Sequence, residues 1–336
     1  MRNWQARLDQ LSQQGMLRSM RVVDGQGPKV NINGREALLL CSNNYLGIAE
    51  HPALTEAMLV ATRQYGTGSG ASRLVSGTMP PHAALEERIA FFKGSAAALL
   101  FNSGYAANTG ILQGLFGPDD VIFSDELNHA SIIDGCRLAR ARTVVYPHCD
   151  VAALAELMAD EKPQRKGRWL IVTDGVFSMD GDSADIKALA SLAKQHAATL
   201  MIDDAHGVGV LGVTGLGSLQ ASGLCASDVP LLIIPAGKAL GGHGALILSN
   251  SEIIQHLLET ARPYLFSTAP APAMAASVSA ALNLLAHAPE YHQQLQSNIA
   301  TFKQLAQQAA LPVMPSSSAI QPIMVGSNAR ALQYSE

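Results

Sequence analysis

The chain has 336 residues, of which 48% are hydrophobic and 15% charged, and its formal net charge is −4. That composition suffices for a large buried core, which predicts one large domain with a smaller companion, and it argues against a nucleic-acid partner. The four cysteines lie far apart without a C-x-x-C pair, which argues against a disulfide framework or a zinc site and favours the reducing cytoplasm. Because no apolar run reaches about 18 residues, we expect no membrane-spanning helix.

The N-terminal segment MRNWQARLDQLSQQG is typical of an amphipathic surface helix, since it lacks the apolar centre of a signal peptide. Further along, short apolar runs alternate with helical patterns, and these runs are apolar throughout rather than at every second residue. That alternation favours a mostly parallel sheet flanked by helices. We expect strands at 98–101, 121–124, 143–146, 169–173, 199–203, 231–234 and 245–248, and helices at 106–115, 131–139, 151–158 and 185–196.

After about Pro270 the pattern changes to two long helices, at 270–288 and 290–309, followed by the strand-like AIQPIMVG and by NARALQYSE, which predicts the opening of another helix. A small C-terminal α+β domain is therefore expected to begin here and to be incomplete. The predicted division of the chain is an N-terminal helix and arm at 1–44, a large α/β domain at 45–270 and the start of the small domain at 271–336.

Ligands of such sheets bind at the carboxyl ends of the strands, so the residues after each strand are the candidates for chemistry. In FNSGYAANTG, Gly104 and Tyr105 open a helix whose free N–H groups suit a phosphate, although an ordinary strand–turn–helix connection fits equally. In SDELNHASIIDG, His129 starts another helix, where a capping or packed histidine is the simpler interpretation.

The segment IDDAHGVGVLG ends an apolar strand in Asp203 and Asp204, with His206 close behind. A carboxylate leaving a buried strand needs a cationic or hydrogen-bonding partner. A structural cap and a functional carboxylate remain open for Asp203, and a metal site is the least favoured because no cluster of further ligands lies nearby in sequence.

Lys238 in LLIIPAGKALGG follows an apolar strand directly, where it is a solvated loop residue, a phosphate ligand or a reactive amine. A Walker-type loop is excluded because Leu232 and Ala239 replace the required glycine and hydroxyl residue, and YGTGSGASRLVSG follows a helical pattern rather than the strand of a dinucleotide fingerprint. Pyridoxal 5'-phosphate explains the combination, since it requires a lysine, a carboxylate for the ring nitrogen, a phosphate cradle and a planar group against the ring. Lys238, Asp203, the Gly104–Tyr105 amides and His129 supply these in turn.

The motifs SNNYLG, YGTGSGASRLVSG, NSGYAAN, NHAS, DGVFSMDGD, DDAHGVG and GKALGG occur in this order, and with them the sequence resembles the α-oxoamine synthase family over essentially its whole length. The resemblance implies the fold type I architecture of the pyridoxal-phosphate aminotransferases and the decarboxylative condensation of an amino acid with an acyl thioester. GVFSMDGDSA, SAIQPIMVG and the helix around Trp4 are most similar to the members that condense L-alanine with a pimeloyl thioester of coenzyme A or acyl-carrier protein in biotin biosynthesis.

The resemblance implies a role for each matching residue. Lys238 is the Schiff-base lysine and removes the substrate α-proton, Asp203 pairs with the pyridine nitrogen, and His206 hydrogen-bonds the phenolic oxygen. His129 stacks on the ring and orients the acyl carbonyl, and Ser178 lies close to the cofactor. The resemblance also assigns Gly104 and Tyr105 to the phosphate cradle, and Ser267 and Thr268 to the phosphate of the neighbouring subunit of a homodimer. On the substrate side, it assigns Asn44 and Ser72 to the entrance and Arg18 or Arg21 to the distal pimeloyl carboxylate. No metal is expected.

The sequence departs from the family in three respects. Pro235 stands where a family hydroxyl binds the phosphate, so a contact worth about 1.5–3 kcal/mol is missing. Asp174 stands where related synthases often carry glutamate, and the chain ends before the arginine that clamps the amino-acid carboxylate. Two alternatives remain: a glycine-using relative, of the 2-amino-3-ketobutyrate CoA ligase or 5-aminolevulinate synthase type, and an inactive cofactor-binding homologue.

Overall fold

The computed structural model describes residues 4–335, and its centre is a seven-stranded sheet with the order β4-β10-β9-β8-β7-β5-β6. Neighbouring strands from β9 to β6 run parallel, whereas β10 is antiparallel to both β4 and β9. The strands are β4 (Ala97–Phe101), β5 (Val121–Asp125), β6 (Arg142–Tyr146), β7 (Trp169–Asp174), β8 (Thr199–Asp203), β9 (Leu231–Pro235) and β10 (Ala245–Ser249).

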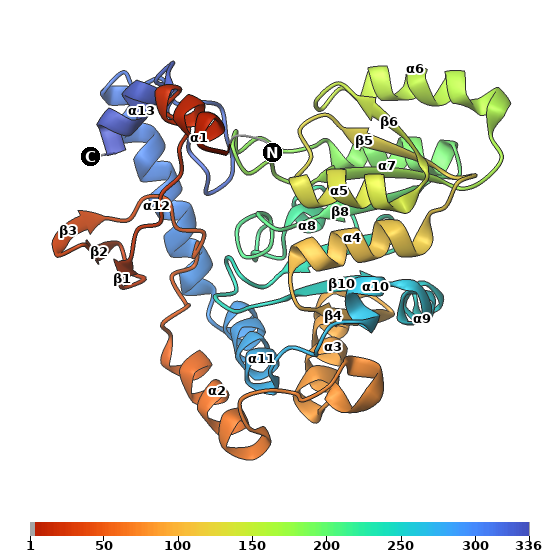
Figure 1. Cartoon of the computed structure of the whole chain (residues 1–336), viewed down its shortest axis with the longest axis horizontal. Coiled ribbons are helices and arrows are strands. Elements are labelled where there is room, and N and C mark those ends of the chain that lie inside the picture. Colours follow the sequence, from red (N-terminus) through yellow and green to blue (C-terminus); the bar gives the residue numbers. More distant parts are fainter. Residues whose placement is uncertain (1–3, 336) are drawn as a thin grey trace.

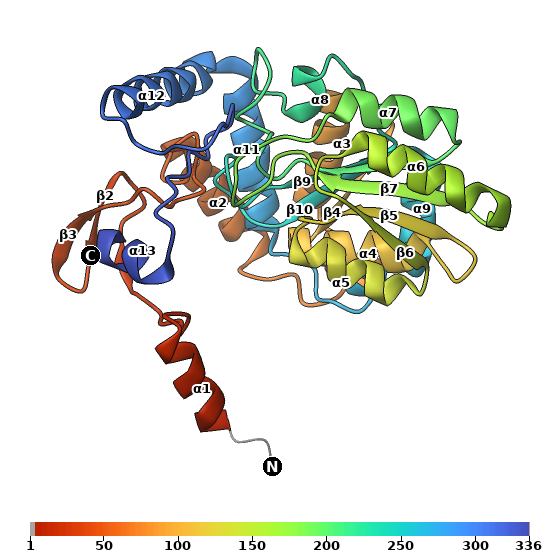
Figure 2. The ribbon, with the colours of Figure 1, turned by 90° about the horizontal axis from the view of Figure 1, so that it is seen from above.

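Helices cover both faces of this sheet, as Figure 2 shows. Alternate strand residues enter different cores, so that Leu170 and Val172 pack on one side and Ile171 on the other. Burial on both faces is the reason why these strands are apolar throughout. One face carries α4 (Gly104–Leu115), α5 (Ala130–Ala139), α9 (Ser251–Thr260) and α10 (Arg262–Leu265), and the other carries α3 (Pro80–Lys93), α6 (Val151–Glu161), α7 (Ile186–Gln195) and α11 (Pro272–His287).

The remaining elements lie to one side of the sheet in Figure 1, apart from the short helix α8 (Ser218–Ala221) and the single turns at Arg73–Gly77 and Lys162–Gln164. They include a small antiparallel sheet of three short strands and the long helix α12. No helix within residues 4–335 has the length and hydropathy that crossing a membrane requires. The elements are α1 (Trp4–Gln13), β1 (Val23–Asp24), β2 (Lys29–Ile32), β3 (Arg35–Leu38), α2 (Pro52–Tyr65), α12 (Pro289–Gln308) and α13 (Asn328–Ser335).

The predicted mostly parallel sheet is confirmed, and each predicted strand matches an observed one to within one residue at either end. The predicted N-terminal helix is present over Trp4–Gln13, while residues 1–3 lie outside the described range. The prediction of a strand in AIQPIMVG is wrong, because this segment makes only a single bridge, between Val313 and Ile323. Pro322 interrupts the run, and a proline has no N–H to donate to a strand ladder.

Candidate active site

Two buried carboxylates lie side by side where β7 and β8 end. Asp174 and Asp203 are register partners in these parallel strands and are only 6% and 4% exposed. The Asp203 carboxylate accepts hydrogen bonds from Asn108 Nδ2 at 2.7 Å and from the Ala205 N–H at 3.0 Å. Burial raises the pKa of Asp203, while the Asn108 hydrogen bond and the charge of Lys238 act in the opposite direction.

Asp174 is less well supplied with donors. Its carboxylate accepts a hydrogen bond from the His129 N–H at 2.7 Å, and no other described residue donates to it. Burial raises the pKa of Asp174 well above its usual value, and the neighbouring Asp203 charge raises it further. The two carboxylates therefore share an environment but differ in how well each is stabilised as an anion.

Lys238 lies in the turn between β9 and β10, where the charges of both carboxylates act on it. Burial lowers the pKa of its ammonium, while the charges of Asp203 and Asp174 raise it. Among residues 4–335, no side chain forms a hydrogen bond or an ion pair with this ammonium. A half-buried amine with a lowered pKa and no fixed partner has the properties of an amine nucleophile.

His206 is held beside this group by Tyr45. The Tyr45 hydroxyl lies 2.7 Å from His206 Nδ1 and 3.2 Å from Asn43 Oδ1. Burial lowers the pKa of His206 to about 3, and burial raises the pKa of Tyr45 to about 12, so both groups are neutral near pH 7. The Tyr45 hydroxyl donates its one proton to Asn43 Oδ1, so we assign the imidazole proton to Nδ1, which donates to the Tyr45 oxygen and leaves Nε2 as an acceptor.

The turn between β4 and α4 forms an amide cradle at the same edge of the sheet. The first-turn N–H groups of Gly104 and Tyr105 have no intrahelical acceptor, as at any helix N-terminus. A Cβ atom at Gly104 would lie 3.1 Å from Pro235 Cγ, so glycine allows α4 to begin against the end of β9. Pro235 therefore lies directly beside the cradle and adds no donor to it.

The other predicted residues lie at varying distances from this group. His129 is an exposed residue that caps α5, and its charge acts on both Asp203 and His206. Ser178 is exposed in the loop after β7. Thr268 pairs with Ser72 in an isolated bridge, with Ser267 beside it, and Asn102 Nδ2 donates to the Thr268 carbonyl at 2.9 Å.

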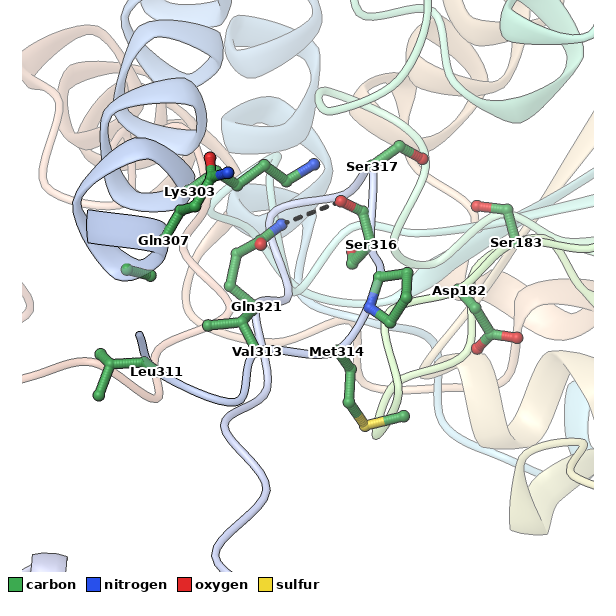
Figure 3. A pocket seen from close by; sticks show the side chains of 12 residues that line it. Asp182, Ser183, Lys303, Gln307, Leu311, Val313, Met314, Ser316, Ser317 and Gln321 are labelled. Atoms are coloured by element: carbon green, nitrogen blue, oxygen red, sulfur yellow. Dashed lines mark hydrogen bonds between the residues drawn. The ribbon is translucent and has the colours of Figure 1, made fainter. Parts of the chain in front are cut away.

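Three predicted substrate residues lie on the N-terminal arm side. Asn44 precedes Tyr45 and lines, with it, a cavity of about 660 Å³. Arg18 and Arg21 are exposed in the segment between α1 and β1 and form no ion pair with a described residue. A second cavity, of about 740 Å³, lies between the 182–183 loop, the end of α12 and residues 311–321, and none of the predicted site residues lines it (Figure 3).

Sequence reasoning missed the residues that support the site. Asn108 lies one helical turn after Gly104, on the buried face of α4, and that spacing is the one signal that pointed to it. Tyr45 gave no signal, because its partner His206 is 161 positions away. Asp204 is fully buried with Lys93, whose Nζ lies 4.0 Å from its Oδ2, and the Ser218 N–H and hydroxyl donate to it.

The chain is similar in sequence to a known family and its members. The sequence profile of the aminotransferase class I and II family matches residues 35–336. The 8-amino-7-oxononanoate synthase of Geobacter sulfurreducens is 52% identical over 331 residues, which cover 97% of this chain and 84% of that protein. Such identity over almost the whole chain exceeds what a shared fold alone requires.

Solved structures agree with the sequence comparison. Serine palmitoyltransferase from S. paucimobilis with bound PLP and myriocin superposes with a TM-score of 0.90 at 28% identity, over 98% of this chain and 86% of that chain. The 8-amino-7-oxononanoate synthase of Francisella tularensis gives 0.76 at 29% identity, over 88% and 83%. The buried Asp203, the Lys238 amine, which has no side-chain partner within residues 4–335, and the α4 amides fit pyridoxal phosphate, which needs an anion, an amine and a phosphate cradle. The chain belongs to the pyridoxal-phosphate-dependent α-oxoamine synthases, within the aminotransferase class I and II family.

Proposed function

We propose that the protein is an 8-amino-7-oxononanoate synthase that condenses L-alanine with a pimeloyl thioester and releases carbon dioxide and the free thiol, a step of biotin biosynthesis. The observation that carries the proposal is the placement of Lys238 and the buried Asp203 after the adjacent strands β9 and β8, where the Asp203 charge acts on the Lys238 amine. The 52% identity with the Geobacter sulfurreducens synthase supports the choice among related reactions.

Bound pyridoxal phosphate supplies a ring that withdraws electrons from the substrate α-carbon. Lys238 anchors the cofactor through its amine and, once displaced, accepts the α-proton at Nζ. Asp203 keeps a proton on the ring nitrogen, because an anion beside that nitrogen favours its charged form. His206 is neutral, and we assign its Nε2, the ring nitrogen that Tyr45 does not engage, to a hydrogen bond with the phenolic oxygen.

The remaining assignments concern binding. Gly104 and Tyr105 offer N–H groups to the phosphate, and His129 stacks on the ring and orients the acyl carbonyl. The other proposed contacts are Ser178 at the cofactor, Ser267 and Thr268 at the phosphate of a second subunit in a homodimer, Asn44 and Ser72 at the entrance, and Arg18 or Arg21 at the pimeloyl carboxylate. We also infer a cytoplasmic protein, for which the free cysteines Cys41, Cys136, Cys149 and Cys225 are the support.

The cofactor role of Lys238 is tested by titrating the purified chain with pyridoxal phosphate and following the visible absorption of the lysine-bound form. We expect the band in the wild-type protein and in Lys187→Ala, a control at an exposed lysine of α7, and we expect no band in Lys238→Ala. A band that survives in Lys238→Ala would disprove the assignment.

Substrate choice is tested separately, by comparing alanine and glycine as amino donors. Each is offered with pimeloyl-CoA, pimeloyl-acyl-carrier protein, acetyl-CoA and succinyl-CoA, and product amino ketone is measured. The proposal requires the highest kcat/KM for alanine with a pimeloyl thioester. A preference for glycine would favour the ligase or aminolevulinate type of enzyme, and a stable absorption band that alanine does not change would favour an inactive homologue.

A further inference from the structure

Asp174 occupies the middle of a row of three carboxylates at the ends of β5, β7 and β8. Asp125 lies on one side of it and Asp203 on the other, and both of these charges raise the pKa of Asp174. Of the described residues, Lys238 is the cation whose charge lowers the pKa of Asp174, and the His129 N–H is its hydrogen-bond donor.

Asp125 is balanced by its own partners. Its Oδ1 lies 2.9 Å from His148 Nδ1, and its Oδ2 accepts a hydrogen bond from the Cys149 N–H at 2.8 Å. The other ring nitrogen of His148 lies 2.8 Å from Asp182, so the imidazole is held between two carboxylates. Burial lowers the pKa of His148, but these two hydrogen bonds raise it above its usual value, which favours the cation.

Among the described residues, Lys238 is therefore the one cation that acts on both Asp174 and Asp203, while the exposed His129 acts more weakly on Asp203. Two adjacent buried carboxylates opposite one ammonium carry an excess negative charge, and a buried charge without a partner costs several kcal/mol. Asp203 accepts two hydrogen bonds, one of them from Asn108 at 2.7 Å, whereas Asp174 accepts one. The anion is thus better stabilised on Asp203, and the proton belongs on Asp174.

We propose that Asp174 and Asp203 hold one proton between them in the cofactor-free site, on Asp174, and that Asp174 releases it to solvent when the cofactor binds. The second half rests on the proposed function. A protonated ring nitrogen beside Asp203 adds a positive charge to the site while the lysine nitrogen keeps its own. Two cations then face two carboxylates, and each added cation lowers the pKa of a neighbouring carboxyl group. The released proton would come from the Asp174 carboxyl O–H. Separately, the Lys238 amine would condense with the cofactor aldehyde, forming a C=N bond and losing water, and the proton of the ring nitrogen would come with the cofactor or from solvent.

The first test uses infrared difference spectra of the cofactor-free full chain at pH 8, where Asp204, with its pKa raised to about 6, is ionised. We expect the carbonyl band of a protonated carboxyl group in the wild type and in Asp119→Asn, a control at an exposed carboxylate. The band should be absent from Asp174→Asn, in which the amide oxygen still accepts the His129 N–H. Absence of the band from the wild type, or its survival in Asp174→Asn, would overturn the proposal.

Asp203→Asn decides whether the proton is shared. One carboxylate then faces one ammonium, so we expect Asp174 to ionise and the band to vanish from this variant too. A band that persists in Asp203→Asn would mean that burial alone protonates Asp174, and the sharing would be refuted. Circular dichroism checks that each variant folds, and either variant alone is sufficient to refute the proposal.

The release is tested by calorimetry of pyridoxal phosphate binding in buffers that differ in ionisation enthalpy. We expect Asp174→Asn to release up to about one proton fewer per site than the wild type and Asp119→Asn to match the wild type. Equal proton release in wild type and Asp174→Asn would refute the coupling. If the wild type bound no cofactor, the proposed function would fail, whereas the infrared result on the cofactor-free chain would stand independently.

Discussion

The buried Lys93–Asp204 pair offers the sharpest test of how the loop beside the site is held. Lys93 Nζ lies 4.0 Å from Asp204 Oδ2, and their side chains are 5% and 0% exposed. Lys93 also donates to the Leu216 carbonyl, so the ammonium ties the end of α3 to the loop that follows His206. At this separation and an effective dielectric constant of about 20, the attraction is about 4 kcal/mol.

Lys93→Met removes the cation and leaves Asp204 with the Ser218 hydrogen bonds alone. Burial raises the pKa of Asp204 to about 6 in the wild type, with Lys93 lowering it, so its pKa in the variant is higher still. The folded variant then binds a proton that the unfolded chain releases, and its stability continues to fall as pH rises above about 6. The loss relative to wild type is limited to about 1.4 kcal/mol per pH unit, or about 2.7 kcal/mol between pH 6 and pH 8.

Urea unfolding at pH 5 and pH 8 measures this difference. We expect Lys93→Met to lose about 2–3 kcal/mol more at pH 8 than at pH 5, because Asp204 is protonated in both proteins at the lower pH. The double variant Lys93→Met with Asp204→Asn is the matched control and should show little pH dependence. An equal loss of stability at both pH values would refute the electrostatic account and attribute the loss to changed packing alone.

Three further predictions concern single residues around the site. Tyr45→Phe removes the hydrogen bond to His206 and should lower the free energy of unfolding by about 0.5–1.5 kcal/mol in urea titrations, with no loss if the contact is unimportant. His148→Gln should cost most below the unfolded pKa of about 6.5 and progressively less as pH rises through the raised folded value, so a loss that grows with pH would contradict the paired imidazolium. Pro235→Thr adds a hydroxyl beside Gly104 and should tighten pyridoxal phosphate binding about tenfold or more by absorbance titration, whereas unchanged affinity would separate this position from the phosphate.

The central sheet could be predicted from the sequence because its strands are buried on both faces. In β7, Leu170 and Ile171 enter different cores, so a run of apolar letters marks the strand without ambiguity. The strands β1–β3 escaped prediction because they are short and mostly exposed, with no apolar run. AIQPIMVG produced the opposite error, a strand predicted where none forms, because the segment is apolar in composition but contains a proline.

The candidate site could be predicted only in part. Asp203 and Lys238 follow consecutive parallel strands, and the carboxyl ends of such strands meet at one edge, so their proximity follows from topology. Their supporting partners do not follow from topology, because Asn108 and Tyr45 reach the site through the packing of α4 and of the N-terminal arm. A contact across 161 positions leaves no local periodicity to detect.

Asp203 and Asp204 are adjacent in sequence, yet they interact with different lysines and have different roles in the structure. Asp204 forms an ion pair with Lys93 and accepts hydrogen bonds from Ser218, and these contacts hold the loop that carries His206. Asp203 faces Lys238, whose ammonium has no hydrogen-bond or ion-pair partner among residues 4–335. The ion pair of Lys93 and Asp204 fixes the backbone of the loop. Lys238, which is not fixed in such a pair, keeps an amine with a lowered pKa available for reaction. What separates the structural pair from the reactive pair is therefore the partners that the fold supplies, since the residue types are the same.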